Sequence, residues 1–375
     1  MKIAIDVHSI GSGAGGNETF YRQLVAGLIS ENGDHQFFLF YTHPAAPKAF
    51  ANDERVTWIQ IPRDPFFRNV LSLPRWLQKL RPDVFHCQYV KPPFVRCPTV
   101  VTIHDIGHEH LPEHFHPLYV ARQRRLVRAT ARKADHILTV SEFAARDIAT
   151  TYGIGRQKIT VAYQAPASIF RPYDKQAAQR ELAARCKINV PFLLYVGRLN
   201  SRKNLLRLVQ AYAAARTHGV TAALVLAGPR DWRSGQVLAC ITELGLESHV
   251  VLPGYIAPDD LPLFLSACEA FVYPSLFEGF GLPVVEAIAC GAPVITSRGS
   301  ALEEVAGDAA LIVDPLDTRS IADAIERMLH DPALRTELAQ RGLRRCAHFL
   351  PEELPRKTLT AYELAIVAAR ANSSQ

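Results

Sequence analysis

The stretch PSLFEGFGLPVVEAIACGAPVIT, residues 274–296, indicates the end of a strand, a loop with two glycines, a short helix and a second strand. Gly279 and Gly281 free the loop backbone to adopt unusual dihedral angles and to approach a ligand closely. Pro283 suits the first helical position, where its missing N–H is not needed. The free N–H groups around residues 281–284 predict an anion site at the start of the helix, which the helix dipole strengthens.

Two carboxylates flank this predicted phosphate cradle. Glu278 lies in the loop, and Glu286 lies about one turn into the helix. Taken singly, each glutamate is more often structural, because the helix dipole favours acidic residues near a helix start. Neither carboxylate would be stabilised by facing a diphosphate, since like charges repel. As a pair they suit the role of acceptors for the hydroxyl groups of a phosphorylated sugar.

Apolar strand-like runs alternate with helical stretches along the whole chain, which predicts a parallel α/β architecture. A helix is expected from about Asn17 to Ile29. Sheets of this kind bind ligands beyond the carboxyl ends of their strands. Strands are expected at Lys2–Val7, Gln36–Tyr41, Asp83–Cys87, Thr99–His104, His136–Val140, Phe192–Val196, Ala222–Ala227, Val250–Pro253, Ala270–Tyr273, Pro293–Thr296 and Ala310–Val313.

Size and composition describe an ordinary soluble protein. At 375 residues the chain exceeds what one core usually serves, so two domains are expected. No apolar run approaches the ~18 residues that cross a bilayer, and the first residues do not form a signal peptide. The seven cysteines are scattered and contain no Cys-x-x-Cys pair, which argues against structural zinc or a disulfide framework and for a reducing cytoplasm.

The net charge of +6 is concentrated in the first half of the chain. Residues 1–174 hold 21 Lys and Arg against 15 Asp and Glu, whereas residues 175–375 hold 21 of each kind. The basic segment Arg122–Lys133 is either a solvated helix face or a surface for an anionic membrane or a phosphorylated acceptor. Nucleic acid is not expected as a partner, since no nucleic-acid module accompanies the segment.

A second candidate anion site lies in Tyr195–Asn204. A buried strand ends near Gly197, and Ser201 is a credible N-cap for the next helix, which places Arg202 and Lys203 in its first turn. Cations there oppose the helix dipole at roughly 0.3–1 kcal/mol each. A diphosphate bound between Arg198 and Lys203 would account for them, and a surface basic pair without ligand is the alternative.

Two further features lie near strand ends of the first half. Gly11–Gly16 matches G-x-G-x-x-G, which raises a nicotinamide-dependent oxidoreductase as an alternative, although Asp6–Ile10 intervenes between strand and glycines. His104 follows an apolar strand, and Asp105 is expected to orient its imidazole. The histidines between residues 108 and 116 lack regular helical spacing, because prolines interrupt them, so no metal site is expected.

The segment Glu278-Gly-Phe-Gly-Leu-Pro-Val-Val-Glu286, followed by Ala-Cys-Gly-Ala-Pro-Val-Ile, resembles the retaining GT-B glycosyltransferases of family 4, also called group 1. The resemblance implies two Rossmann-like parallel-sheet domains that face each other across a cleft. It implies an acceptor-side domain over residues 1–170 and a donor domain over 171–350. Residues 351–375 would form a helix that crosses back to the first domain.

The resemblance also implies roles for individual residues. His104, Glu278, Arg198 and Lys203 would act on the transferred sugar and the departing diphosphate. The glycine loop would close over the donor phosphates. The implied donor-binding residues are Gly15, Gly16, Arg198, Lys203, Tyr255, Ile256, Glu278, Gly279, Phe280, Gly281, Leu282 and Glu286.

The function implied is a metal-independent hexosyltransferase without cofactor. It would move a hexose, mannose or a related sugar by preference, from a GDP- or UDP-linked donor to a glycan or lipid-linked glycan, as in polysaccharide biosynthesis. A cytoplasmic protein is expected, with peripheral contact to the inner membrane face through its basic first half. A glycan phosphorylase of the same fold remains an alternative.

Overall fold

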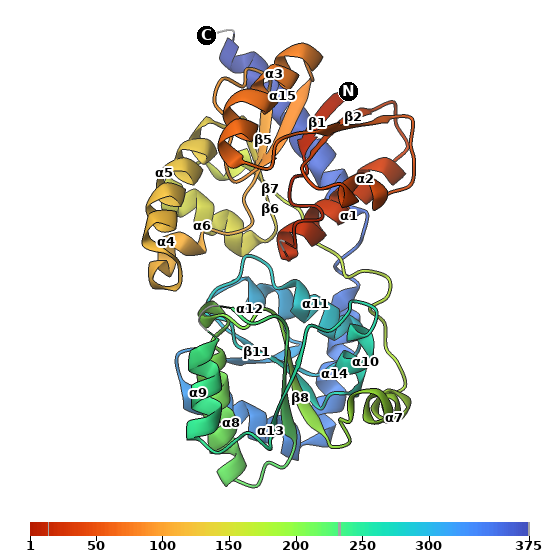
Figure 1. Cartoon of the computed structure of the whole chain (residues 1–375), viewed down its shortest axis with the longest axis vertical. Helices are drawn as coiled ribbons and strands as arrows, with labels where there is room; N and C mark the ends of the chain where they lie inside the picture. The colour runs from red at the N-terminus through yellow and green to blue at the C-terminus, as the bar shows by residue number, and fades with distance from the viewer. Residues whose placement is uncertain (14, 232–233, 374–375) are drawn as a thin grey trace. The chain divides into compact units, whose positions relative to one another are not determined.

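The computed structural model describes residues 1–13, 15–231 and 234–373. The chain divides into two compact units (Figure 1). Unit 1 comprises Met1–Gln164 together with Leu350–Gln375, and unit 2 comprises Ala165–Phe349. Each unit is built around one sheet whose neighbouring strands all pair in parallel, so the predicted α/β architecture is confirmed.

The seven-stranded sheet of unit 1 has the order β3-β2-β1-β4-β5-β6-β7. Its central strands are buried and apolar, as parallel strands covered on both faces must be. The strands are β1 Lys2–Asp6, β2 Gln36–Tyr41, β3 Val56–Gln60, β4 Val84–Gln88, β5 Thr99–Thr102, β6 His136–Thr139 and β7 Ile159–Val161.

Helices cover both faces of this sheet. One face packs against α3, α5 and α6 through a core that includes Phe85, Leu77 and Val127. Because side chains alternate along a strand, His86 points to the opposite face, where α1 and α15 pack against each other. The helices are α1 Gly16–Ser30, α2 Ala45–Lys48, η1 Phe67–Ser72, α3 Leu73–Leu80, α4 Gly107–His110, η2 Pro112–His114, α5 Pro117–Lys133, α6 Glu142–Tyr152, η3 Arg156–Lys158 and α15 Glu353–Ser373.

The last helix, α15, is fixed to the sheet of unit 1 by a buried polar contact. His86, which is fully buried, binds the Tyr362 hydroxyl through Nδ1 at 2.8 Å and the Thr102 hydroxyl through Nε2 at 2.6 Å. Burial lowers the pKa of His86 to about 3, so the imidazole is neutral. The segment nearest the carboxyl terminus is therefore part of the core of unit 1.

The six-stranded sheet of unit 2 has the order β10-β9-β8-β11-β12-β13. The order reverses between β8 and β11, and this is the place where doubly wound sheets bind ligands. The strands are β8 Phe192–Val196, β9 Ala223–Ala227, β10 Val250–Gly254, β11 Ala270–Tyr273, β12 Val294–Ser297 and β13 Ala310–Val313.

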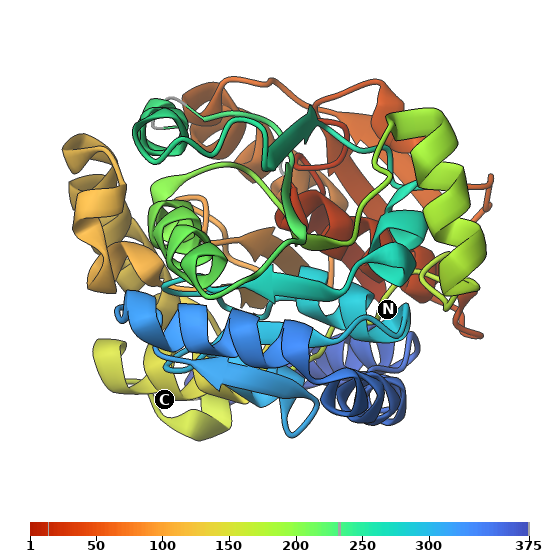
Figure 2. The ribbon, with the colours of Figure 1, turned by 90° about the horizontal axis from the view of Figure 1, so that it is seen from below.

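The helices of unit 2 form two groups. Contacts join α9, α8 and α13 in one group, and Figure 2 shows α8 and α13 side by side. Contacts join α7, α10, α11 and α14 in the other, and α12 packs against α11 and β12. The helices are α7 Lys175–Cys186, η4 Ser201–Lys203, α8 Leu205–Thr217, α9 Gly235–Glu243, α10 Leu261–Ala267, α11 Leu282–Ala289, α12 Ala301–Ala306, α13 Thr318–His330 and α14 Pro332–Cys346.

Two strands of unit 1, β3 and β7, were absent from the sequence-based prediction. Both lie at the edges of the sheet. In β3 only Ile59 is buried, and β7 is three residues long with only Ile159 buried. Edge strands such as these are short and half-exposed, so they lack the continuous apolar run that reveals a central strand.

Candidate functional site

Glycines bring the strand ends of unit 2 close together. β8 and β9 are each followed by a glycine, and β10 ends in one. The Gly228 N–H donates to the Gly254 carbonyl at 2.7 Å, and a Cβ on Gly228 would lie 2.0 Å from the Gly197 carbonyl oxygen. Only a residue without a side chain fits at this carboxyl edge.

The turn after β8 differs from the predicted one. Asn200, and not Ser201, is the N-cap: its side-chain oxygen accepts from the Lys203 N–H at 3.2 Å. Residues 201–203 form the short turn η4, and α8 begins only at Leu205. Arg202 and Lys203 therefore do not occupy the first turn of a long helix, and the expected conflict with its dipole is absent.

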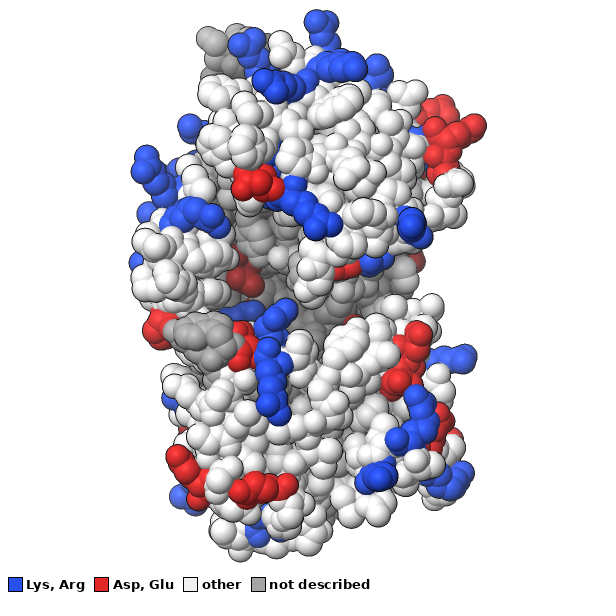
Figure 3. All heavy atoms as spheres, viewed as in Figure 1, with Lys and Arg blue, Asp and Glu red and all other residues white. Residues whose placement is uncertain are grey.

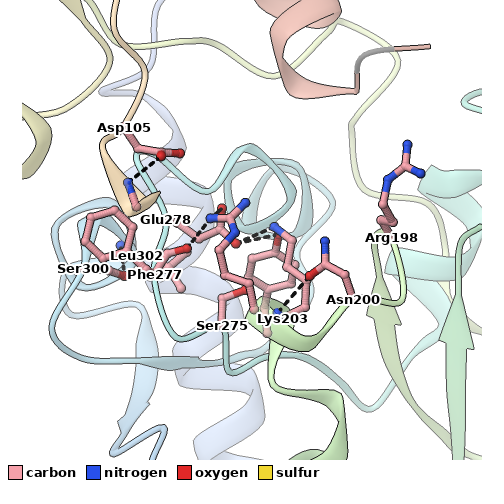
Figure 4. Close-up of polar contacts among 12 residues, drawn as sticks. Asp105, Arg198, Asn200, Lys203, Ser275, Phe277, Glu278, Ser300 and Leu302 are labelled. Atoms are coloured by element: carbon pink, nitrogen blue, oxygen red, sulfur yellow. Dashed lines mark hydrogen bonds and ion pairs between the residues drawn. The ribbon is translucent and has the colours of Figure 1, made fainter. Parts of the chain in front are cut away.

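The two cations of η4 are instead directed at Glu278. The Lys203 ammonium binds the Glu278 carboxylate directly and donates to the Tyr273 hydroxyl at 2.6 Å. The Tyr273 hydroxyl donates to the same carboxylate at 3.3 Å, and Arg202 lies 3.5 Å from its other oxygen. Arg202 also donates to the Phe277 carbonyl. Figure 4 shows Lys203 and Glu278 pointing toward each other.

This cluster is buried and carries a net positive charge. The Glu278 residue is only 7% exposed. Burial would raise the pKa of Glu278, but the charges and hydrogen bonds of Lys203 and Arg202 lower it to about 2, so the carboxylate is ionised. Two cations face one anion, which leaves one positive charge at the carboxyl end of β8 and β11.

Arg198 does not join this cluster. The residue is exposed, and its guanidinium points away from the Lys203–Glu278 pair in Figure 4. No ion pair or hydrogen bond of its side chain to another described residue is present. The predicted clamp between Arg198 and Lys203 is thus not formed by the protein alone. Arg198 is nevertheless placed two residues beyond the end of β8, at the same sheet edge.

The glycine loop after Glu278 leads directly into α11. Gly281 precedes α11 with φ 103°, and a Cβ there would lie 2.4 Å from the Leu302 side chain. Pro283 is the second residue of the helix. Among the described residues, the N–H groups of Gly281 and Leu282 meet no acceptor. These N–H groups are available to an acceptor, and anion binding at the helix start stays a prediction.

The second glutamate, Glu286, lies on α11 and differs from Glu278 in charge state. Its carboxyl group has no hydrogen bond or ion pair with any other described residue. Burial raises the pKa of Glu286 to about 8, so the group is mostly protonated at neutral pH. The two carboxyl groups of the motif therefore differ: one is a paired carboxylate, and the other is a neutral acid that can donate as well as accept a hydrogen bond.

We expect Glu286→Gln to change how the free energy of unfolding depends on pH. The folded pKa of about 8 exceeds the ordinary 4.5, so the wild-type chain loses stability as pH rises from 4.5 to 8, while below 4.5 the group has no effect. Glutamine does not ionise, so the variant should gain a few kcal/mol, at roughly 1.4 kcal/mol per pKa unit, over the wild type across this window. Urea titrations at pH 5 and pH 8 measure it, and a pH-independent difference would contradict the raised pKa.

Tyr255 and Ile256 follow β10 at the same edge of the sheet. Tyr255 is 71% exposed, whereas Ile256 is buried. Gly254, just before them, has φ 78° and turns the chain there. These residues thus lie beside the end of β9, because Gly228, which follows β9, donates its N–H to the Gly254 carbonyl.

In unit 1, His104 lies beyond the end of β5 in a buried pocket of aromatic rings. Its ring meets Phe20 edge-on with centroids 4.7 Å apart, and Gln88 contacts its Nε2 at 3.0 Å. Burial lowers the pKa of His104 to about 4, so the ring is neutral. The expected orienting contact from Asp105 is wrong, since that carboxylate accepts from the Gly107 N–H at 2.9 Å.

The glycine loop of unit 1 binds a carboxylate of its own chain. Glu18, in the first turn of α1, accepts from the Gly11 N–H at 2.9 Å and from the Gly13 N–H at 3.0 Å. Gly15 and Gly16 open the helix, and within the described part of the chain no atom lies within 4 Å of a Cβ at either position. β1 ends at Asp6 and α1 begins at Gly16, so the loop lacks the direct strand-to-glycine step of a dinucleotide fingerprint.

Three residues that matter to this geometry were not among the predicted site residues. Arg202 and Tyr273 contact Glu278, and Gln88 contacts His104. Tyr273 and Gln88 share one sequence signal: each is the last residue of a buried strand and carries a polar group to the carboxyl edge of its sheet. For Arg202 the sequence signal was its charge beside Lys203, at a position where a cation was unexpected.

Among residues 1–13, 15–231 and 234–373, no three His, Cys, Asp or Glu side chains gather as metal ligands. Within the same ranges, no helix combines the length and the apolar character that would carry it across a membrane.

Comparison with known proteins identifies the family. The family described as "Glycosyl transferases group 1" matches residues 180–345, and "Glycosyltransferase Family 4" matches residues 14–165. O-antigen chain mannosyltransferase B of Escherichia coli is 33% identical over 267 residues, which cover 71% of this chain and 70% of that protein. The chain belongs to glycosyltransferase family 4, whose members transfer a sugar from a nucleotide-sugar donor.

Solved structures show that the fold is GT-B. Sucrose-phosphate synthase from Thermosynechococcus elongatus superposes with a TM-score of 0.81 at 23% identity, covering 98% of this chain and 100% of that chain. HepE of Anabaena, solved in complex with UDP and glucose, gives a TM-score of 0.75 at 19% identity, covering 96% and 98%. The oxidoreductase alternative is thereby set aside, because the chain is a glycosyltransferase.

Proposed function

We propose that this enzyme transfers mannose or a related hexose, with retention of anomeric configuration, from a nucleotide diphosphate sugar to a glycan or lipid-linked glycan. The observation that carries the donor class is the positively charged Lys203–Arg202–Glu278 cluster in unit 2, which the anion-ready start of α11 follows in sequence. The 33% identity to an O-antigen chain mannosyltransferase supports mannose and a polysaccharide acceptor. GDP is our preferred nucleotide of the donor, and UDP is the alternative.

In this proposal the diphosphate binds to the free N–H groups of Gly281 and Leu282 and to Arg198. Arg198 is exposed and unengaged, so it can close on a phosphate without first breaking an ion pair. Lys203 contributes its charge while its ammonium holds the Glu278 carboxylate. These groups together stabilise the negative charge that builds on the departing diphosphate.

The sugar and the ribose are assigned to the two glutamates. Glu278 is ionised and held in place, so it accepts hydrogen bonds from sugar hydroxyls and stabilises a positively charged anomeric carbon. Glu286 is protonated near neutral pH, so it can both donate to and accept from the ribose hydroxyls. Gly279 and Phe280 lie between the two glutamates in sequence, in the loop that leads into α11.

The remaining predicted site residues take positions around the donor in the proposal. His104 contacts the transferred sugar as a neutral imidazole, because its pKa of about 4 leaves no charge near neutral pH. The backbone at Tyr255 and Ile256 contacts the base. Gly15 and Gly16 close over the phosphates, which requires the loop to exchange its contact with Glu18 for the donor. The departing phosphate takes the proton of the acceptor hydroxyl, and no metal is used.

A panel of nucleotide sugars tests the donor assignment. We expect GDP-mannose to raise the melting temperature and to support transfer to a glycan acceptor, with the α-linked product showing retention. Arg198→Ala should lower kcat/KM at least ~100-fold, which is the usual loss of a group that stabilises transition-state charge. Its melting temperature should not change, because the side chain has no partner among the residues that the structure describes.

The matched control is Arg319→Ala, since Arg319 is 88% exposed on α13 and pairs only at 3.9 Å. This variant should keep wild-type kcat/KM. Normal transfer by Arg198→Ala would overturn the diphosphate assignment. Transfer from UDP-sugars alone would overturn the choice of base but not of site.

We further propose that the acceptor is presented at the inner face of the cytoplasmic membrane. The positive excess of residues 1–174 supports contact with an anionic surface. A lipid-linked glycan would be reached there without a membrane-spanning helix.

A further inference from the structure

Unit 1 exposes large aromatic side chains around η1 and the loop after β4. Phe66 is 63% exposed, Phe67 is 54% exposed, and Phe94 is 81% exposed. Phe94 also has φ 65°, a left-handed conformation that residues other than glycine rarely adopt. A strained backbone that holds an aromatic ring in solvent is better explained by a binding role than by folding.

Two hollows join Phe67 and Phe94 into one surface, and the Phe66 ring adjoins it, with its centroid 5.7 Å from that of Phe67. The larger has a volume of about 970 Å³ and is lined by Leu71, Arg75, Phe94 and Arg96 among others. The smaller, of about 550 Å³, is lined by Phe67, Leu71 and Arg75 among others. Because Leu71 and Arg75 line both hollows, the two form one continuous surface of apolar and basic side chains, which we call the η1–α3 surface.

The η1–α3 surface has a strongly positive border. Residues 62–98 carry seven basic residues, Arg63, Arg68, Arg75, Lys79, Arg81, Lys91 and Arg96, against two acidic ones, Asp64 and Asp83. Both acidic side chains are occupied by backbone N–H groups. Figure 3 shows mainly uncharged atoms over this part of unit 1, with Lys and Arg around them and little Asp or Glu.

Arg68 and Lys91 are mostly buried and lie 4.0 and 3.9 Å from the carboxylates of Asp6 and Asp135, so the cations available for a partner are the others. Arg75, Arg81 and Arg96 form no ion pair with any residue that the structure describes. The Lys79 ammonium lies 5.1 Å from the Trp76 ring centre, which places an amphipathic ring beside a cation, as at membrane interfaces. Exposed aromatic rings bordered by unpaired cations complement a surface that is apolar inside and anionic outside.

We propose that the η1–α3 surface docks unit 1 on an anionic lipid bilayer, with Phe66, Phe67 and Phe94 inserted among the headgroups and Arg75, Arg81 and Arg96 on lipid phosphates. This deepens the membrane contact suggested under the proposed function and moves it away from the basic helix α5. In α5, Arg124 and Arg128 pair with Glu109, and Arg132 donates to the Tyr152 carbonyl. Those cations are used within the protein.

Vesicle sedimentation of the full chain tests the proposal without donor or acceptor, so its failure is separate from failure of the glycosyltransfer assignment. Wild-type protein should bind vesicles with 30% phosphatidylglycerol, and not vesicles of phosphatidylcholine alone, and 0.5 M NaCl should weaken binding. Phe66→Ser/Phe67→Ser/Phe94→Ser should reduce binding at least ~10-fold, because binding scales with buried apolar area.

A charge variant and a matched control locate the surface. Arg75→Gln/Arg81→Gln/Arg96→Gln should lower the partition coefficient about 100-fold, roughly fivefold per cation. The control Arg122→Gln/Arg125→Gln, on exposed positions of α5, should bind like wild type. All variants should keep the wild-type melting temperature and transfer to a water-soluble acceptor.

Four results would overturn the proposal. The first is no binding of the wild type to anionic vesicles, and the second is full binding by the phenylalanine variant. The third is loss of binding in the α5 control. The fourth is a concentration-dependent dimer in gel filtration that the phenylalanine variant abolishes, which would assign the surface to a second copy of the chain.

Discussion

Glu278→Gln should cost this enzyme about 3–5 kcal/mol of unfolding free energy and at least ~100-fold in transfer rate. The substitution keeps the shape of the side chain but leaves Lys203 and Arg202 buried without their counter-charge. The pKa of Glu278 is about 2 in the folded chain against an ordinary 4.5, which likewise means that the ionised carboxylate stabilises the fold. This stabilisation is present above pH 4.5 and is lost as pH falls toward 2.

A second variant separates stability from catalysis. In Glu278→Gln/Lys203→Met the ammonium is removed together with the carboxylate that it binds, so most of the lost stability should return. Transfer should remain abolished, because the sugar then lacks its carboxylate. Glu337→Gln is the control, since its pair with Arg341 is exposed and should contribute less than ~1 kcal/mol.

Urea unfolding and transfer assays on these four proteins, wild type included, measure both effects. A loss below ~1 kcal/mol in Glu278→Gln would show that the ion pair is not a buried one in solution. Near-normal transfer in the same variant would refute the role of Glu278 toward the sugar.

Gly228→Ala, which adds one methyl group, should reduce the stability of unit 2 more than any other glycine-to-alanine substitution there. Its φ of 138° is unfavourable for any residue with a side chain, and the new Cβ would lie 2.0 Å from the Gly197 carbonyl oxygen. Both partners are backbone, so no side chain can rotate away, and the ends of β8 and β9 must separate. We expect a loss of more than ~4 kcal/mol, or little soluble protein.

Gly235→Ala is the matched control for this prediction. Gly235 is the first residue of α9, and no atom of the described residues lies within 4 Å of a Cβ there. Alanine is a better helix former than glycine by up to ~1 kcal/mol, so this variant should be as stable as wild type or slightly more stable. Differential scanning fluorimetry compares the two variants, and a wild-type melting temperature for Gly228→Ala would refute the close approach.

The sequence predicted strands with a continuous apolar run better than any other element. Gln36–Tyr41, Phe192–Val196, Ala270–Tyr273 and Ala310–Val313 end where the prediction placed them. A continuous apolar run between charged or glycine-containing turns has few alternative boundaries. The helix after β1 also lies within one residue of its predicted bounds at each end, and it buries Phe20 and Leu24. The edge strand β3 was not predicted, because partial exposure removes the continuous apolar run.

Within the site, the sequence located the segments but not their pairing. Lys203 and Glu278 are 75 residues apart, and no local pattern shows that the ammonium meets this carboxylate. Without that contact, the sequence favoured a diphosphate over a surface basic pair as the explanation of the cations of η4. The neighbouring caps Asn200 and Ser201 are equally good by residue type, so the choice between them depends on the turn geometry.

The last helix has a consequence for how the chain is made. β4 and α15 meet at His86 and Tyr362, which are 276 residues apart. A ribosome has released all of unit 2 before it releases Tyr362, so unit 2 can fold during synthesis while the earlier-made sheet of unit 1 still lacks α15 on the face that α1 shares with it. The first half of the chain to be translated is therefore the last to be completed, and part of its core stays exposed in the interval.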